Sequence, residues 1–123
     1  MGRKVLVIDD EPDIREIVEM LLSDAGWSVL LAASGGEGVA LAAREQPDAI
    51  LLDVMMPVLD GPATLARLQA GPATARIPVI FLTAKAQQKD LERLRSLGAA
   101  GVLLKPFDPM QLPAQIAGLL AQA

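Results

Sequence analysis

The chain of 123 residues contains no cysteine and no histidine, which excludes a disulfide framework, a thiolate nucleophile, a Cys/His zinc site and histidine-based catalysis. Its length fits a single domain, residues 1–123, and hydrophobic residues make up 52% of it, enough for a core without a structural metal. A net charge of -4 without a local Lys/Arg cluster opposes direct nucleic-acid binding, and no apolar run approaches the roughly 18 residues of a membrane span. A cytoplasmic location is therefore expected.

The first apolar run, residues 5–8, precedes the clearest helical pattern of the chain. Apolar residues recur there at the spacing of one helix face: Ile14, Ile17, Val18, Leu21 and Leu22. Pro12 suits the first turn of such a helix, and Gly26 suits its C-terminal cap. The pattern predicts a strand followed by an amphipathic helix.

Four further apolar runs follow, at residues 29–32, 49–52, 79–82 and 102–104, and each precedes a weaker helical pattern. The second predicted helix starts at Ser34, where Ser34 and Glu37 have the spacing of a capping box. The third starts near Asp60, the fourth ends at Gly98, and the last starts near Asp108. The apolar runs are continuous rather than alternating, which is typical of strands covered on both faces.

Alternating strands and helices in a chain of this size predict an α/β fold with five parallel strands and helices on both faces, a (βα)5 three-layer sandwich. Right-handed crossovers and the short length favour the flavodoxin-like strand order 2-1-3-4-5. In such a sheet the functional site lies beyond the carboxyl ends of the strands, where the strand order reverses.

Polar residues follow four of the five predicted strands: Asp9, Asp10 and Glu11 after the first, Asp53 after the third, Thr83 after the fourth and Lys105 after the fifth. The second strand, which lies outside the point where the order reverses, ends in alanines. Three converging aspartates raise one another's pKa unless a cation intervenes. Oxygen ligands with open positions suit a hard, partly hydrated cation such as Mg²⁺ or Mn²⁺.

Asp53 is the predicted phosphoryl acceptor, because it lies between the acidic pair and the Thr/Lys pair and because carboxylates can form aspartyl phosphates. Asp9 and Asp10 are predicted to hold the metal. Thr83 would donate a hydrogen bond to a phosphoryl oxygen, and Lys105 would pair with the phosphoryl charge. Strands lie about 4.8 Å apart, so the lysine must span roughly 10 Å to the third strand, which is within its reach.

Four motifs carry a resemblance to a known family. They are VLVIDDEP at 5–12, LLDVMMP at 51–57 followed by Asp60-Gly61, PVIFLTA at 78–84, and LLKPF at 103–107 preceded by Gly98-Ala99. In this order and spacing, they resemble the receiver domains of response regulators in two-component signalling. The resemblance implies the strand order 2-1-3-4-5 and a phosphoprotein that receives its phosphoryl group from a sensor histidine kinase or a phosphotransfer protein, with Mg²⁺ essential.

The resemblance also implies roles for individual residues. Asp10 would be the more direct metal ligand, Asp9 would act largely through water, and the backbone carbonyl of Met55 would be a third ligand. The Lys105–Pro106 bond would be cis. Such a domain promotes its own phosphorylation and dephosphorylation but has no separate substrate, so the resemblance does not imply an enzyme.

Signal output is a further implication of the resemblance. The surface of the fourth helix, fifth strand and fifth helix would bind an output protein or a second copy of the chain. Val102 stands where the family usually has an aromatic residue, so the usual aromatic switch is not expected. Met55 and Lys85 occupy positions that control access to the phosphoryl group, and neither can orient an attacking water, which predicts slow self-dephosphorylation. The chain is expected to be a stand-alone regulator or a receiver from a longer protein.

Three other functions fit the residues less well. A haloacid-dehalogenase-type phosphohydrolase needs a second aspartate two residues after its nucleophile, where this chain has Met55. A nucleotide- or flavin-binding module needs a glycine- or hydroxyl-rich loop after the first strand, where Asp9 and Asp10 would repel phosphates. A receiver that signals without phosphorylation is opposed by the complete set of polar residues, and phosphate transfer to Asp53 would exclude it.

Overall fold

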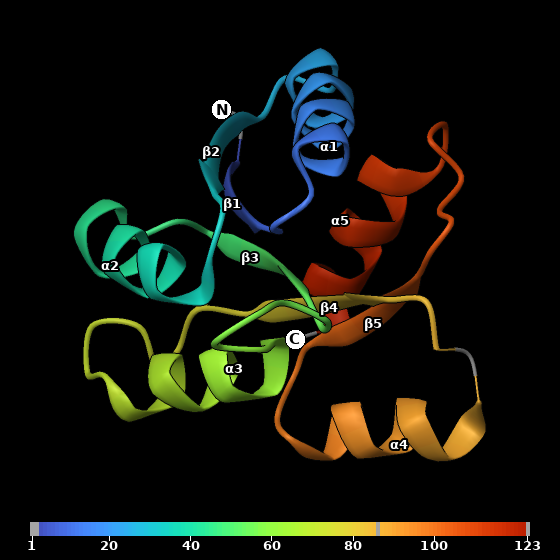
Figure 1. The fold of residues 1–123 in the computed structure, drawn as a ribbon. Helices are drawn as coiled ribbons and strands as arrows, with labels where there is room; N and C mark the ends of the chain where they lie inside the picture. The colour runs from blue at the N-terminus through green and yellow to red at the C-terminus, as the bar shows by residue number, and fades with distance from the viewer. Residues whose placement is uncertain (1–2, 86, 123) are drawn as a thin grey trace.

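The computed structural model describes residues 3–85 and 87–122 and contains a five-stranded parallel sheet (Figure 1). The strand order is β2-β1-β3-β4-β5, which confirms the prediction. The strands are β1 Lys4–Ile8, β2 Ser28–Ala32, β3 Ala49–Asp53, β4 Val79–Thr83 and β5 Gly101–Leu104. Each strand agrees with a predicted apolar run to within one residue at either end.

Helices cover both faces of the sheet, as the sandwich prediction requires. They are α1 Pro12–Asp24, α2 Gly35–Glu45, α3 Gly61–Ala70, α4 Gln88–Ser96 and α5 Leu112–Gln122. α1 and α5 lie on one face, and α2, α3 and α4 lie on the other (Figure 1). Successive residues of β1 alternate between the two cores, with Leu6 and Ile8 in one and Val5 and Val7 in the other. Within the described residues, none of the helices has the length and apolar composition that crossing a membrane requires.

The strands end together at one edge of the sheet. Every residue of β3 and β4 is buried, which explains why these two runs lack alternating polar positions. The register pairs Ile8 with Leu52 and Asp53 with Leu82, so β1, β3 and β4 reach the same level. β5 continues the pattern, because Thr83 pairs with Leu104. Residues at the ends of these strands are therefore neighbours in space.

Side-chain caps fix two helix starts near this edge. Oγ of Ser34 accepts a hydrogen bond from the Glu37 N–H at 3.2 Å, and Oδ1 of Asp60 accepts one from the Ala63 N–H at 2.9 Å. Gly61 begins α3, and a Cβ at this position would lie 2.6 Å from the backbone oxygen of Asp53. The absence of a side chain at Gly61 therefore lets α3 begin directly against the end of β3.

The last helix starts later in the chain than predicted, at Leu112 rather than near Asp108. Oδ1 of Asp108 accepts a hydrogen bond from the Met110 N–H at 3.0 Å, and its backbone oxygen accepts one from the Gln111 N–H at 3.0 Å. These bonds form a turn in place of the first helical turn. Pro113 then lies in the first turn of α5, where its missing N–H removes no helix hydrogen bond.

Candidate functional site

The polar residues predicted from the strand ends meet at the carboxyl edge of the sheet. Asp9 directly follows β1, Asp53 ends β3, Thr83 ends β4, and Lys105 directly follows β5. Asp9, Asp53 and Thr83 are buried, with 1%, 3% and 1% of their surface exposed. Polar groups with so little exposure must be satisfied by one another or by a bound species.

Lys105 connects the carboxylates of this site. Its Nζ lies 3.1 Å from Oδ1 of Asp53, 3.4 Å from Oδ2 of Asp9 and 3.5 Å from Oε1 of Glu11. The predicted reach of the lysine from β5 to β3 is confirmed. Glu11 has no role in the sequence prediction, although its place beside the acidic pair was a signal that could have indicated one.

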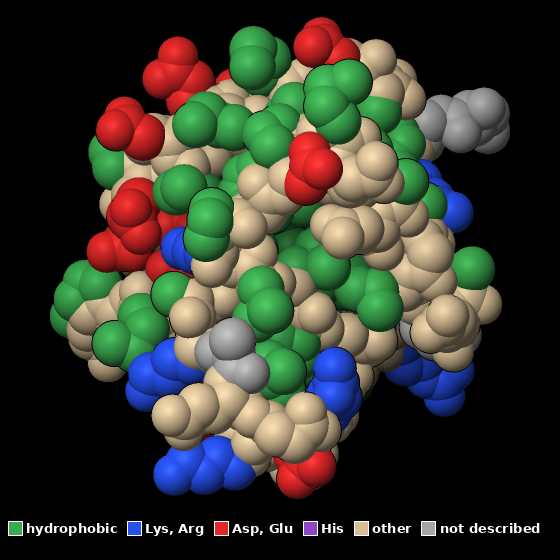
Figure 2. Space-filling model, turned by 90° about the vertical axis from the view of Figure 1, so that its right-hand side faces the viewer, with side chains coloured by type: hydrophobic (Ala, Val, Ile, Leu, Met, Phe, Trp, Pro, Cys, Tyr) green, Lys and Arg blue, Asp and Glu red, His purple; other side chains and the backbone are tan. Residues whose placement is uncertain are grey.

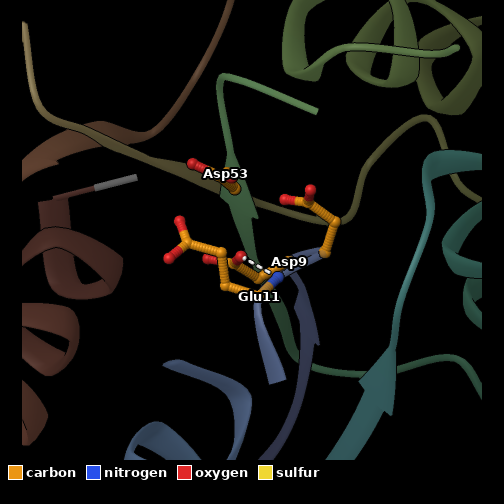
Figure 3. A group of neighbouring side chains, drawn as sticks. Asp9, Glu11 and Asp53 are labelled. Carbon is orange, nitrogen blue, oxygen red and sulfur yellow. Dashed lines mark hydrogen bonds between the residues drawn. The ribbon is translucent and has the colours of Figure 1, made fainter. Parts of the chain in front are cut away.

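Asp9 is held in place by the start of α1. Its Oδ1 accepts a hydrogen bond from the Glu11 N–H at 2.9 Å, shown as the dashed line in Figure 3. Nη1 of Arg15 donates to the backbone oxygen of Asp9 at 2.7 Å. These contacts leave Oδ2 of Asp9 facing Lys105. Arg15 is thus a supporting residue that the sequence pattern did not predict.

Four carboxylates are close enough to share a cation. Asp9, Asp10, Glu11 and Asp53 each place one oxygen within 4.8 Å of the others. Figure 3 shows Asp53 at the end of β3, opposite Asp9 and Glu11 in the segment after β1. Oδ2 of Asp53 is buried and has no hydrogen-bond partner among residues 3–85 and 87–122. A buried carboxylate oxygen without a partner is costly, and oxygen donors are those that Mg²⁺ prefers, so these residues fit the predicted ion.

The electrostatics of the site also favour a cation. Burial raises the pKa of Asp53 above its ordinary value, the Lys105 hydrogen bond opposes this, and the Asp9 charge raises it further. Burial raises the pKa of Asp9 as well, against the lowering effects of the Glu11 N–H and Lys105. Burial lowers the pKa of Lys105, but its contacts with Asp53 and Asp9 outweigh this and leave that pKa raised. The lysine therefore stays an ammonium ion beside an excess of negative charge.

Thr83 ends β4, one position after Leu82, which pairs with Asp53 of β3. Its Oγ1 accepts a hydrogen bond from the Lys85 N–H at 3.1 Å. The hydroxyl hydrogen remains available for donation, because a hydroxyl group both donates and accepts. Thr83 therefore has the donor capacity that its predicted role requires.

The structure also describes four further features that were predicted from the sequence. The Lys105–Pro106 bond is cis, as the resemblance implied. Val102 is half-buried, pairs with Phe81 in the register of β4 and β5, and packs against the same core. The side chain of Met55 is 66% exposed, and Lys85 is also exposed. The roles predicted for Met55, Lys85 and Val102 stay predictions.

An apolar groove of about 390 Å³ opens beside Lys105. It lies between α1, the segment after β4 and the segment after β5, and is lined by Ile14, Ile17, Ala84, Lys105, Pro106, Phe107 and Pro109. Figure 2 views the molecule from the right-hand side of Figure 1 and shows hydrophobic side chains spread across this face. In this view most acidic side chains lie in the upper half, among hydrophobic ones, and most basic side chains lie in the lower half.

Comparison with known proteins relates the chain to response regulators, in agreement with the resemblance seen in the sequence. A family model described as the response regulator receiver domain matches residues 5–117. The DNA-binding dual master transcriptional regulator RpaA of a Synechocystis strain is 42% identical over 117 residues, which are 95% of this chain and 48% of that protein. The alkaline phosphatase synthesis transcriptional regulatory protein PhoP of Bacillus subtilis is 35% identical over 123 residues, 100% of this chain and 50% of that protein. The chain thus spans about half the length of the curated relatives it matches.

Solved structures agree over almost the whole chain. The chemotaxis protein CheY4 of Vibrio cholerae superposes with a TM-score of 0.90 at 33% identity, covering 97% of this chain and 99% of that one. The receiver domain of the sensor histidine kinase PA1611 of Pseudomonas aeruginosa gives a TM-score of 0.87 at 34% identity, covering 98% and 99%. That receiver domain has a magnesium ion coordinated in its active site cleft.

Proposed function

Because the chain belongs to the receiver-domain family of response regulators, we propose that Asp53 is the residue that accepts its phosphoryl group. The acidic pocket of Asp9, Asp10 and Asp53 is consistent with Mg²⁺-dependent phosphorylation on an aspartate. The arrangement of the Asp53 carboxylate carries the proposal. Lys105 contacts its Oδ1 at 3.1 Å, whereas its Oδ2 has no partner in the described part of the chain. One oxygen is held in place, and the carboxylate keeps a free oxygen for the metal or for phosphorus.

Asp9, Asp10, Asp53 and the backbone carbonyl of Met55 would hold the Mg²⁺ or Mn²⁺ ion. The bound ion would supply positive charge beside the carboxylates and the incoming phosphate oxygens. Three aspartate charges are balanced by this ion together with the Lys105 ammonium. A dianionic phosphoryl group could therefore approach Asp53 without severe repulsion.

The proposed transfer forms a bond between phosphorus and an Asp53 carboxylate oxygen and breaks the bond between phosphorus and the donor atom. The electron pair of the broken bond stays with the donor, which is a ring nitrogen when the donor is a phosphohistidine. The hydroxyl group of Thr83 donates a hydrogen bond to a phosphoryl oxygen. Lys105 pairs with the negative charge of the same group.

The donor that we propose is a sensor histidine kinase or a phosphotransfer protein. The apolar groove beside Lys105 supports a protein donor, because Ile14, Ile17 and Phe107 could contact an apolar helix that carries the phosphohistidine. The proposed output partner is a protein, or a second copy of the chain, that binds the face of α4, β5 and α5. Leu104 supports this surface, since 41% of it is exposed.

Residues 1–123 would act as one cytoplasmic receiver domain without a separate substrate. Phosphorylation would act as a switch by favouring one of two conformations that partners bind differently. DNA binding of the kind named for RpaA would belong to a part of a regulator other than these residues, because the acidic charge here opposes it.

Intact mass measurement after incubation with acetyl phosphate tests the proposed function. We expect one phosphoryl adduct in the presence of Mg²⁺, none when the metal is chelated, and none in Asp53→Asn. Asp60→Asn is the matched control, because it makes the same change in an exposed residue whose capping role asparagine can fill. No adduct on the folded wild-type protein would contradict the proposal.

A further inference from the structure

Glu11 is the third carboxylate that contacts Lys105. Its Oε1 lies 3.5 Å from the lysine Nζ, and 60% of its side chain is exposed. The other two partners, Asp9 and Asp53, lie at 3.4 and 3.1 Å and are buried. The contacts with Asp53 and Asp9 are hydrogen bonds, whereas the contact with Glu11 is an ion pair.

The local backbone leaves the Glu11 side chain free for this contact. Glu11 is the N-cap residue of α1, with φ -86 and ψ 114, and its side chain makes no capping hydrogen bond in the described part of the chain. Its N–H is fixed against Oδ1 of Asp9 at 2.9 Å (Figure 3). The backbone of Glu11 thus holds one aspartate while its side chain reaches the lysine that contacts both aspartates.

The three contacts of Lys105 differ in how easily they can be lost. Phosphorylation turns the Asp53 carboxylate into an acyl phosphate, so Lys105 must turn N–H donors away from its present contacts and toward the phosphoryl oxygens. Asp9 stays a buried carboxylate, and leaving it unpaired would be costly, which disfavours the loss of its contact with Lys105. Water can replace the lysine at the exposed Glu11 at little cost. Of the two carboxylates that remain, Glu11 is therefore the one whose contact Lys105 loses more easily.

We propose that Glu11 is a positioning residue that holds Lys105 in the unphosphorylated protein and opposes the arrival of the phosphoryl group. The second half of this inference rests on the proposed function of Asp53, whereas the hold on Lys105 does not. Glutamine at position 11 would leave the lysine with two charged partners and remove one negative charge from the entrance of the site. Phosphorylation would then be faster, while Mg²⁺ binding would be slightly weaker.

Amine labelling of the folded, metal-free protein tests the hold on Lys105. We expect acetylation of Lys105, followed by peptide mass analysis, to be about two- to fivefold faster in Glu11→Gln than in the wild-type protein, the range for one partly exposed ion pair. Asp13→Asn is the matched control, because it removes the same charge from an exposed residue in the first turn of α1. Lys89 is the internal reference. Unchanged labelling of Lys105, or an equal rise in the control, would overturn the inference.

Phosphorylation by acetyl phosphate tests the second half of the inference, that Glu11 opposes the arrival of the phosphoryl group. At saturating Mg²⁺ we expect the initial rate to rise about two- to fivefold in Glu11→Gln and to stay unchanged in Asp13→Asn. Calorimetric titration should show Mg²⁺ affinity falling by no more than the same factor. A loss of Mg²⁺ affinity above about tenfold would identify Glu11 as a metal ligand and overturn the inference. If the wild-type protein forms no adduct, the proposed function and this half fail together, and the labelling result still decides whether Glu11 holds Lys105.

Discussion

The side-chain nitrogen of Lys105 lies 3.1 Å from Oδ1 of Asp53, although the two residues are 52 positions apart in the chain. β4 separates the strands that carry them, so the lysine reaches across one intervening strand. This contact exists because β3, β4 and β5 end at the same level of the sheet. It places a positive charge among carboxylates that burial would otherwise leave unpaired.

Replacement of Lys105 by methionine should destabilise the metal-free protein. The aliphatic part of the side chain is kept, but Asp9 and Asp53 lose the ammonium that contacts both. We expect the free energy of unfolding at neutral pH to fall by about 2 kcal/mol, below the range for fully buried pairs because the lysine is partly exposed. Urea unfolding with chelator measures this effect. Lys89→Met changes an exposed residue of α4 and should lower the free energy of unfolding by less than about 0.5 kcal/mol. An equal loss in both variants would show that the contacts of Lys105 with Asp9 and Asp53 do not stabilise the protein.

Asp53→Asn should stabilise the metal-free protein at neutral pH. Burial raises the pKa of Asp53 in the folded state, so its ionised form reduces stability above that pKa. This reduction disappears as the pH falls through the folded-state pKa toward the ordinary value of 3.8. We expect the free energy of unfolding to be about 1 kcal/mol higher in the variant at about pH 8, with a difference that shrinks on acidification. Urea unfolding across this pH range measures the difference, and one that grows in acid would be inconsistent with a raised pKa.

Val58→Gly should stabilise the fold. Val58 has a φ of 67, fully exposes its side chain, and lies in a γ-turn closed by the Leu59 N–H and the Pro57 oxygen at 2.8 Å. A β-branched residue is strained in this conformation, whereas glycine is not. The relieved strain raises the free energy of unfolding, and the greater entropy of glycine in the unfolded state offsets part of this rise. We expect thermal unfolding to show a free energy of unfolding that is about 0.5–1 kcal/mol higher in the variant.

Val58→Ala is the control for this prediction, because alanine keeps the Cβ that causes most of the strain. Val58→Ala should raise the free energy of unfolding by less than half as much as Val58→Gly does. A gain of equal size in both variants would show that the exposed apolar side chain, rather than the backbone conformation, reduces stability.

Met55→Asn combined with Lys85→Glu should speed loss of the phosphoryl group. Met55 and Lys85 follow β3 and β4 beside the site, and neither offers an acid or amide that could orient an attacking water. Such groups accelerate hydrolysis, so we expect the phosphorylated double variant to decay about tenfold faster or more. Intact mass measured over time after removal of acetyl phosphate gives the rate. Lys89→Glu reverses a charge farther along the chain and should leave the decay unchanged; a double variant that decays no faster than the wild type would refute slow self-dephosphorylation.

The strand ends and the convergence of the site could be predicted from the sequence. Continuous apolar runs identified buried parallel strands, and parallel strands bring their carboxyl ends to one edge. Asp9, Asp53, Thr83 and Lys105 could therefore be assigned to one site from their positions after these runs. The reach of Lys105 also followed from the spacing between strands.

Other features depend on details that residue type does not determine. The contact between Glu11 and Lys105 requires particular rotamers of two long side chains and an N-cap residue whose side chain does not cap. The positive φ of Val58 arises where the chain turns between β3 and α3, and valine gives no sign of it. Asp108 can cap a helix or a turn with the same oxygen, so the late start of α5 was not predictable from its position.

The most direct test of the account is to identify the residue that carries the phosphoryl group. Borohydride reduction converts an aspartyl phosphate to homoserine, which peptide mass analysis can locate in the chain. After incubation with acetyl phosphate and Mg²⁺, we predict homoserine at position 53 alone, and none when the metal is chelated. Homoserine at Asp9, Asp10 or another acidic residue, with Asp53 unmodified, would contradict the proposal that Asp53 is the acceptor.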